Sequence, residues 1–109
     1  MSAEFEFELS RSGASLQLAG ALTIQGAQAL LAQLRALLEE ADPPGRLDLA
    51  GVTEIDTAGL QLLLVARRTA AARRRPLCVS AVSPVARAVL ELCRWGELPT
   101  GATPGGAAP

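Results

Sequence analysis

Alternation of apolar and polar residues near the start of the chain predicts a pair of strands. Glu4–Leu9 alternates between acidic and apolar residues, and Ala14–Ala19 repeats the period of two after a turn at Ser12-Gly13. Because successive side chains of a strand point to opposite faces, each strand should bury one face and expose the other. We therefore expect a hairpin.

Helical periodicity follows this hairpin. Between Gln25 and Glu40 the leucines recur at spacings that place them on one helical face, and Asp42–Gly45 (DPPG) ends the predicted helix. A second helix is predicted from about Ala58 to Arg74. It should stop before Pro76, because the residue that precedes a proline disfavours helical backbone angles.

Two short apolar runs, Leu47–Ala50 and Leu77–Val82, predict further strands on either side of the second helix. Ser83-Pro84 has the residue order of an N-cap and a first helical position, so a third helix should run to about Arg94, with Gly96 as its stop. The order is ββαβαβα. Strands joined through helices are parallel, so we expect an α/β fold: a four- to five-stranded mixed sheet with helices packed mainly on one face.

Length and composition indicate one domain. The chain has 109 residues, half of them apolar, which allows a modest core. Residues 1–99 should form this domain, and the Gly/Pro/Ala-rich segment 100–109 should be disordered. We expect a cytoplasmic protein without membrane insertion, because neither a signal peptide nor an apolar run of about 18 residues is apparent.

The residue types argue against catalysis, metal binding and cofactor binding. There is no histidine, no phosphate-binding glycine loop and no nucleophile motif, so no catalytic residue, metal ligand or cofactor site is predicted. Cys78 and Cys93 lack metal-ligand spacing and are expected to be small buried hydrophobic residues. A net charge of −1 also argues against nonspecific nucleic-acid binding.

One turn carries the candidate chemistry. Asp56 is placed to cap the second helix by accepting from the N–H of Ala58 or Gly59, which makes Thr57 the first helical residue. A phosphoryl group on Thr57 would be favoured by the helix N-terminus, and it would add about −1.5 to −2 charges beside Asp56. The alternative is that Asp56 is an ordinary cap and Thr57 an ordinary first-turn residue.

Helical geometry divides the second helix into two sides. At 100° per residue, Gly59, Leu62, Leu63, Ala66 and Ala70 share the side that should face the sheet. The other side combines polar residues with exposed apolar ones, as a small protein-binding patch would. The predicted partner-binding residues are Asp56, Thr57, Ala58, Gln61, Leu64, Val65 and Arg68.

With these residues in place, the chain resembles the STAS family of bacterial anti-sigma-factor antagonists and their relatives. The resemblance rests on Gly20–Thr23 (GALT), Leu47–Leu60 (LDLAGVTEIDTAGL) and the Ser83-Pro84 helix that ends near Trp95–Leu98 (WGEL). It covers about residues 5–99 and implies a STAS-like fold. It also implies a non-enzymatic regulator that docks on a partner kinase or ATPase.

Within the family, the hydroxyl residue of this turn is the phosphorylation site of the antagonist branch, which here is Thr57. Unphosphorylated antagonists bind a GHKL-type anti-sigma kinase, and phosphorylation releases them. This chain departs from many antagonists by having Thr57 in place of Ser and Thr23 in place of Asp. It is also similar to the small cytoplasmic STAS subunit of a lipid-transport ABC system, in which a Thr of this turn contacts the ATPase. We expect a Thr57-switched interaction module, and a constitutive ABC accessory subunit is the alternative.

Overall fold

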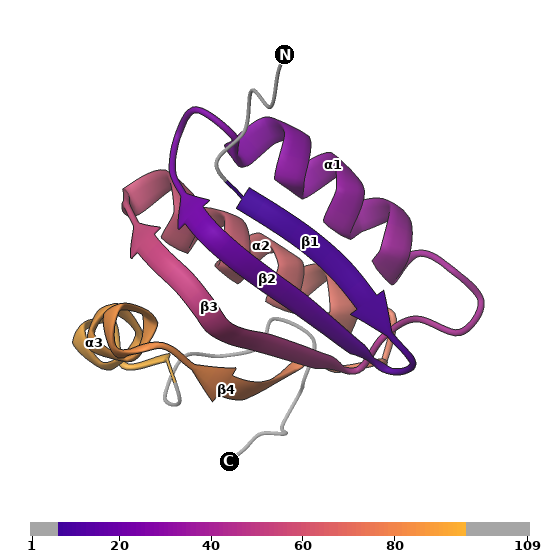
Figure 1. The fold of residues 1–109 in the computed structure, drawn as a ribbon. Coiled ribbons are helices and arrows are strands. Elements are labelled where there is room, and N and C mark those ends of the chain that lie inside the picture. The colour runs from indigo at the N-terminus through magenta and orange to yellow at the C-terminus, as the bar shows by residue number, and fades with distance from the viewer. Residues whose placement is uncertain (1–6, 96–109) are drawn as a thin grey trace.

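The computed structural model describes residues 7–95, which form a four-stranded sheet and three helices (Figure 1). The element order is the predicted ββαβαβα. The elements are β1 (Phe7–Ser12), β2 (Ser15–Leu22), α1 (Ala27–Leu38), β3 (Arg46–Ile55), α2 (Thr57–Ala72), β4 (Cys78–Val82) and α3 (Pro84–Leu92).

The sheet is mixed, as predicted, with the strand order β1-β2-β3-β4. β1 pairs antiparallel with β2, whereas β2, β3 and β4 run parallel to one another. Both helical crossovers advance in the same direction across the sheet, so right-handed connections place α1 and α2 on one face. Figure 1 shows α2 behind the strands and α1 along the β1 edge, and the two helices contact each other. The last helix, α3, instead packs mainly beside β3, past the end of β4.

The two faces of the sheet differ in polarity. On the helix-covered face, Leu16 of β2 pairs with Leu47 of β3, which pairs in turn with Val79 of β4. The opposite face carries small and polar pairs such as Ser10 with Gln17. It therefore offers little apolar surface for a second layer to cover. The fully buried leucines of the core are Leu16, Leu18, Leu22, Leu30, Leu34, Leu38, Leu47, Leu49 and Leu63.

β3 is longer than predicted, because it extends past Ala50 to Ile55. Its pairing with β2 continues through two register shifts, one of which lies next to the pair Ala19–Gly51. A side chain on Gly51 would place its Cβ 2.8 Å from the Cβ of Ala19, so the close approach depends on glycine at this position. The polar residues Thr53 and Glu54 interrupt the apolar pattern, so the sequence analysis did not predict this second half of the strand.

The cysteine expectation was wrong for Cys78. Its side chain is exposed at the start of β4, on the face that lacks helices, and Cys93 is only half-buried. Alternation explains the difference, because the neighbouring Val79 is the residue that packs against the core. Both cysteines are free thiols.

The helix ends lie within two residues of their predicted positions. α2 ends before Arg74, which adopts a left-handed φ of 60° and donates its N–H to Ala71. The N–H of Arg75 returns to Ala70, which completes a Schellman-type C-terminus. Residues 4–6 of the first predicted strand, the stop at Gly96, the domain boundary at 99 and the tail 100–109 lie outside the described residues. None of the helices within residues 7–95 combines the length and the hydropathy that a membrane span requires.

Candidate functional site

The predicted cap of α2 is present. One carboxylate oxygen of Asp56 accepts a hydrogen bond from the N–H of Gly59 at 2.9 Å, which is one of the two donors expected from the sequence. The other oxygen accepts from the N–H of Ile24 at 3.0 Å. Asp56 therefore joins the start of α2 to the loop between β2 and α1, and this second contact was not predicted.

These hydrogen bonds also set the charge of the turn. The N–H of Gly59, followed by that of Ile24, lowers the pKa of Asp56 below its ordinary value, and the weaker effect of burial opposes them. The carboxylate is ionised at neutral pH, as an ordinary aspartate is, and these hydrogen bonds keep it ionised to lower pH. The start of α2 thus carries a negative charge beside Thr57.

Gly59 fixes the depth at which α2 lies on the sheet. A Cβ at this position would lie 2.8 Å from the carbonyl carbon of Leu22 and would collide with its oxygen. Only glycine allows the first turn of the helix to approach the backbone at the end of β2 so closely. All five residues predicted to face the sheet are buried: Gly59, Leu62, Leu63, Ala66 and Ala70.

Thr57 is the first residue of α2, and its side chain is exposed. Among residues 7–95, no side-chain hydrogen bond involves its hydroxyl group. The hydroxyl is therefore available to solvent, to a modifying enzyme or to a partner. The position of the hydroxyl follows from the Asp56 cap and from the close packing of Gly59 against the backbone of Leu22.

A shallow groove of about 210 Å³ lies between α1 and α2. It brings together three of the predicted binding residues, Ala58, Gln61 and Val65, with residues of α1 that the sequence analysis did not identify. Helical periodicity within α1 predicted only that Leu31 belongs to the core, because periodicity does not show that α2 packs next to α1. The lining residues are Ala27, Gln28, Leu31, Ala58, Gln61, Leu62 and Val65.

The remaining predicted residues lie elsewhere on α2. Leu64 is half-buried and outside the groove, since one residue step turns it 100° away from Val65. Leu64 lies one helical turn before Arg67. The guanidinium of Arg67 donates a hydrogen bond to the carbonyl of Trp95 at 2.7 Å and lies 4.7 Å from the centroid of the Trp95 ring. Arg68 is exposed outside the groove lining, two turns beyond Gln61 on the same side of α2. The predicted stripe therefore divides into a groove side and a Trp95 side.

Ile24 extends the candidate surface beyond the residues predicted from the sequence. Its side chain is 70% exposed, although its N–H is bound to Asp56. The only sign of this surface residue in the sequence is that an apolar side chain stands in the predicted loop between the GALT segment and the first helix. The structure places it next to the turn that carries Thr57.

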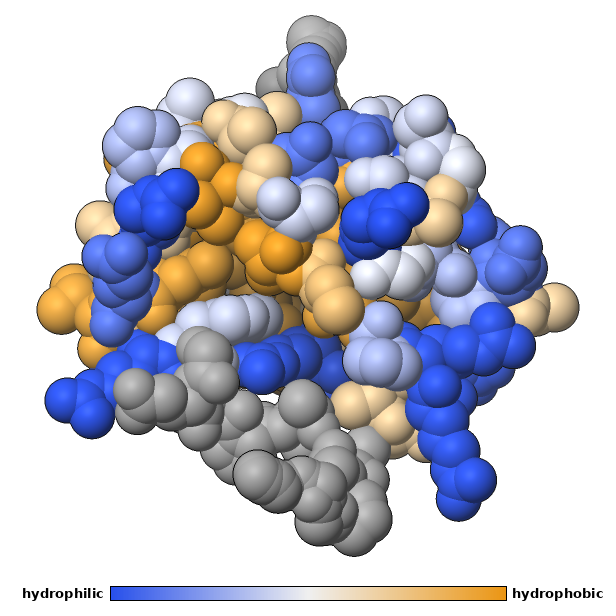
Figure 2. Space-filling view, turned by 90° about the horizontal axis from the view of Figure 1, so that it is seen from below, coloured by the Kyte–Doolittle hydropathy of each residue, from blue (hydrophilic) through white to orange (hydrophobic). Residues whose placement is uncertain are grey.

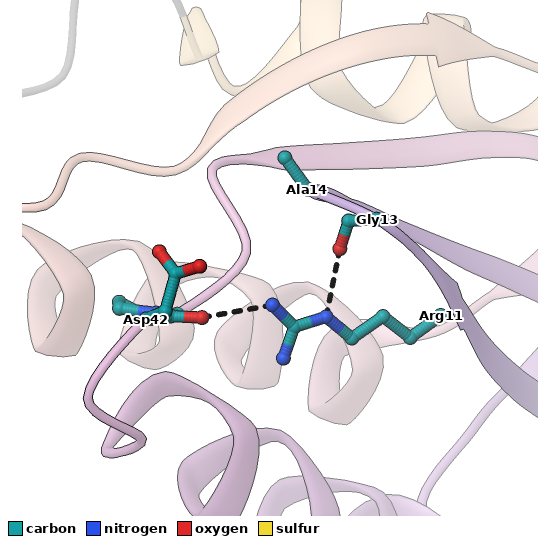
Figure 3. A pocket seen from close by; sticks show the side chains of 5 residues that line it. Arg11, Gly13, Ala14 and Asp42 are labelled. Carbon is teal, nitrogen blue, oxygen red and sulfur yellow. Dashed lines mark hydrogen bonds between the residues drawn. The ribbon is translucent and has the colours of Figure 1, made fainter.

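A second hollow, of about 510 Å³, lies at the opposite end of the sheet and is lined by Arg11, Gly13, Ala14, Asp42 and Pro43. Figure 3 shows the Arg11 guanidinium bridging the carbonyl groups of Gly13 and Asp42, both at 2.8 Å. A 2.7 Å ion pair with Glu40 completes its contacts. Arg11 therefore serves to tie the hairpin to the loop after α1. Within residues 7–95, no cluster of histidine, cysteine or acidic residues could hold a metal ion.

Apolar side chains also gather on the side of the molecule that carries β4 and α3 (Figure 2). Leu92 and Val85 of α3 are 86% and 39% exposed. This region is separate from the groove between α1 and α2, and none of the residues predicted from the sequence belongs to it.

Comparisons with known proteins agree with this architecture. An anti-sigma factor antagonist from Mycobacterium paratuberculosis matches with a TM-score of 0.65 and 21% identity, over 84% of this chain and 79% of the other. The anti-sigma factor antagonist SpoIIAA in its unphosphorylated form matches with a TM-score of 0.66 and 16% identity, over 83% and 82% of the two chains. These likenesses show a shared fold. A search of curated protein sequences gave no match.

The family comparison covers all of the described residues. A family model described as "Mlab, STAS domain" matches residues 5–100, which include every element from β1 to α3. The fold and this match confirm the resemblance inferred from the GALT and DTAGL segments. The chain belongs to the STAS domain family.

Proposed function

We propose that this protein is a regulatory interaction module that docks on a partner protein through the surface around Thr57, and that phosphorylation of Thr57 controls the docking. The observation that carries the proposal is the exposed Thr57 side chain, at the start of α2 and beside the ionised carboxylate of Asp56. Membership of the STAS family and the fold shared with anti-sigma factor antagonists support a role in protein interaction.

Charge is the means by which such a switch would act. A phosphoryl group on Thr57 would add about −1.5 to −2 charges next to Asp56. The nearest arginine along α2 is Arg67, ten residues away, or about 15 Å along the helix axis. The new charge would therefore stay unneutralised by the first turns of this helix and would face a docked partner. A partner that buries Thr57 would be released by repulsion and by the cost of desolvating the phosphate.

The alternative is a constitutive accessory subunit that binds the ATPase of a lipid-transport ABC system through the same face. Two observations favour it. Thr23 replaces the acidic residue of many antagonists, in the loop that Asp56 joins to the Thr57 turn. The matching family model is also described as "Mlab" rather than as an antagonist. In this case Thr57 would be a contact residue that is never modified.

The test is affinity capture of the tagged chain from its native organism, with mass spectrometry of the captured proteins and of the peptide that contains Thr57. Thr57→Glu should abolish capture of the partner, whereas Thr57→Ala should retain it. Ser10→Glu, on the exposed sheet face, adds the same charge away from the site and should bind normally.

Three results separate the candidates. A GHKL-type kinase partner together with phosphothreonine at position 57 would support the switch. An ABC ATPase partner with unmodified Thr57 would support the accessory subunit. Equal capture by wild type, Thr57→Glu and Ser10→Glu would contradict both candidate functions, because in each of them a charge at Thr57 should weaken binding of the docked partner.

A further inference from the structure

We propose that the groove between α1 and α2 receives an apolar segment of the partner protein, and that acidic residues of this segment lie toward Arg35 and Arg68. The inference rests on the proposed function, since it assigns a chemistry to the partner of the same surface. The groove adjoins Thr57 through Ala58, so one docked protein can cover both.

The groove has a defined direction. α1 and α2 follow the parallel strands β2 and β3, and they therefore begin at the same end of the sheet. The hydrogen bond between Ile24 and Asp56 joins their beginnings. At the far end, the guanidinium of Arg73 lies 3.4 Å from the carbonyl oxygen of Glu39. The groove thus runs from the Asp56 turn toward the C-terminal ends of both helices.

The middle of the groove suits large apolar side chains. Ala27 and Ala58 leave space near its start, and Leu31, Leu62 and Val65 supply apolar walls. Gln28 and Gln61 lie at the rim, and among residues 7–95 neither amide makes a hydrogen bond. Both amides can therefore bind the backbone of a segment that lies in the groove. An apolar centre with a polar rim is the usual arrangement of a protein interface.

Two arginines follow the groove residues toward the C-terminal ends of the two helices. Arg35 follows Leu31 by one turn of α1, and Arg68 follows Gln61 by two turns of α2. Both side chains are exposed, and within residues 7–95 neither takes part in a hydrogen bond or ion pair. Glu39 lies one turn beyond Arg35 but is accompanied by Arg73, so basic residues outnumber acidic ones here. Asp56 makes the opposite end negative.

This polarity selects one orientation for the bound segment. Acidic residues of the segment would meet Arg35 and Arg68, and its uncharged or basic end would lie near Asp56. Charges at an interface rim act mainly on the rate of association and on partner choice. The apolar residues in the groove would provide most of the affinity, because they are the part removed from water.

The experiment is site-specific photo-cross-linking in lysate of the native organism. The full-length chain carries the photoreactive residue p-benzoylphenylalanine at position 28, 61 or 24 in three separate preparations. The cross-linked partner peptides are then sequenced by mass spectrometry. Positions 28 and 61 report on the groove, whereas position 24 reports on the neighbourhood of Thr57 whether or not the groove is filled. The cross-linked segment at positions 28 and 61 should contain large apolar residues followed by acidic ones.

Charge reversal gives a second measurement on the captured partner. The double variant R35E/R68E should lower the partner's affinity by about tenfold and should weaken the dependence of binding on salt. The control R46E/R87E makes the same change in net charge at exposed positions outside the groove, and it should bind as the wild type does.

The outcomes separate this inference from the proposed function. Cross-links at position 24 without any at positions 28 and 61 would overturn the groove assignment and leave docking at Thr57 intact. A groove segment rich in basic residues, or equal binding by R35E/R68E and R46E/R87E, would overturn the assigned polarity. If no protein is cross-linked at any of the three positions, the result would count against both proposals.

Discussion

Asp56 and Ile24 are 32 residues apart in the chain, yet the carboxylate of one accepts the N–H of the other at 3.0 Å. With the 2.9 Å bond from Gly59, this contact makes one side chain responsible for both the start of α2 and the position of the β2–α1 loop. The turn that carries Thr57 is therefore held from two directions. Both contacts can be tested by substitution.

Replacing Asp56 should lower the thermal stability in graded steps. Asp56→Asn keeps one acceptor and can still cap the helix, but it loses the second backbone contact. Asp56→Ala loses both, and we expect its melting temperature to fall by about 5 °C, with Asp56→Asn in between. Thermal unfolding followed by circular dichroism measures the series. Equal melting temperatures for Asp56→Asn and Asp56→Ala would show that the cap contributes nothing.

The same carboxylate predicts a pH dependence. Because the pKa of Asp56 in the folded state lies below its ordinary value of 3.8, the ionised form stabilises the fold above that pH. This contribution is lost as the pH falls through the lower folded-state pKa. The difference in melting temperature between wild type and Asp56→Asn should therefore be constant from about pH 5 to 7 and should shrink below about pH 4. A difference that grows on acidification would contradict the assignment.

Gly59→Ala should be among the most damaging single substitutions. Its methyl group would collide with the Leu22 carbonyl, which belongs to the backbone and cannot rotate away. We expect a loss of about 3 kcal/mol or more in the free energy of unfolding, measured by urea denaturation. Gly45→Ala is the matched control, because nothing lies within 4 Å of its Cβ, and its stability should change by less than about 1 kcal/mol.

Arg74→Gly should raise stability. Arg74 holds a φ of 60° at the end of α2, where glycine avoids the strain that other residues carry. A gain of about 0.5–1 kcal/mol in the free energy of unfolding is expected. Arg75→Gly removes the same side chain one residue later, where φ is not positive, and should give no gain. If both variants were stabilised equally, removal of positive charge would be the cause instead.

Arg67→Ala should loosen the segment that follows α3. The substitution removes the 2.7 Å hydrogen bond to the Trp95 carbonyl and the cation–π contact with its ring. A cost of about 1–2 kcal/mol is expected. The protein has a single tryptophan, so its fluorescence reports on this site directly and should shift to longer wavelength. Arg68→Ala, one residue away and exposed, should leave the emission unchanged.

Local patterns in the sequence were sufficient for most of the architecture. Apolar periodicity placed α1 and identified which residues of α2 face the sheet, whereas the Ser83-Pro84 pair placed the start of α3. The Asp56 cap and the Ser83 cap are both present. The second half of β3 was missed because its side chains do not alternate clearly. Its pairing with β2 depends instead on the close approach of Gly51 to Ala19.

The candidate site was only partly predictable. Helical geometry identified one wall of the groove, Ala58, Gln61 and Val65, but nothing along α2 indicates that α1 lies next to it. The same geometry grouped Leu64 with Val65, although the neighbouring elements separate them. Ile24 was missed for a related reason, since its importance comes from a contact with a residue 32 positions away.

The seat of Gly59 on the Leu22 carbonyl has a consequence for how this protein can change over time. The height of Thr57 above the sheet is set by one backbone resting on another, not by the size of any core side chain. We therefore expect that exchanging leucines elsewhere in the core for other aliphatic residues leaves the hydroxyl group in place. A chain that keeps this contact would present its threonine to a partner at the same position even if its interior changed.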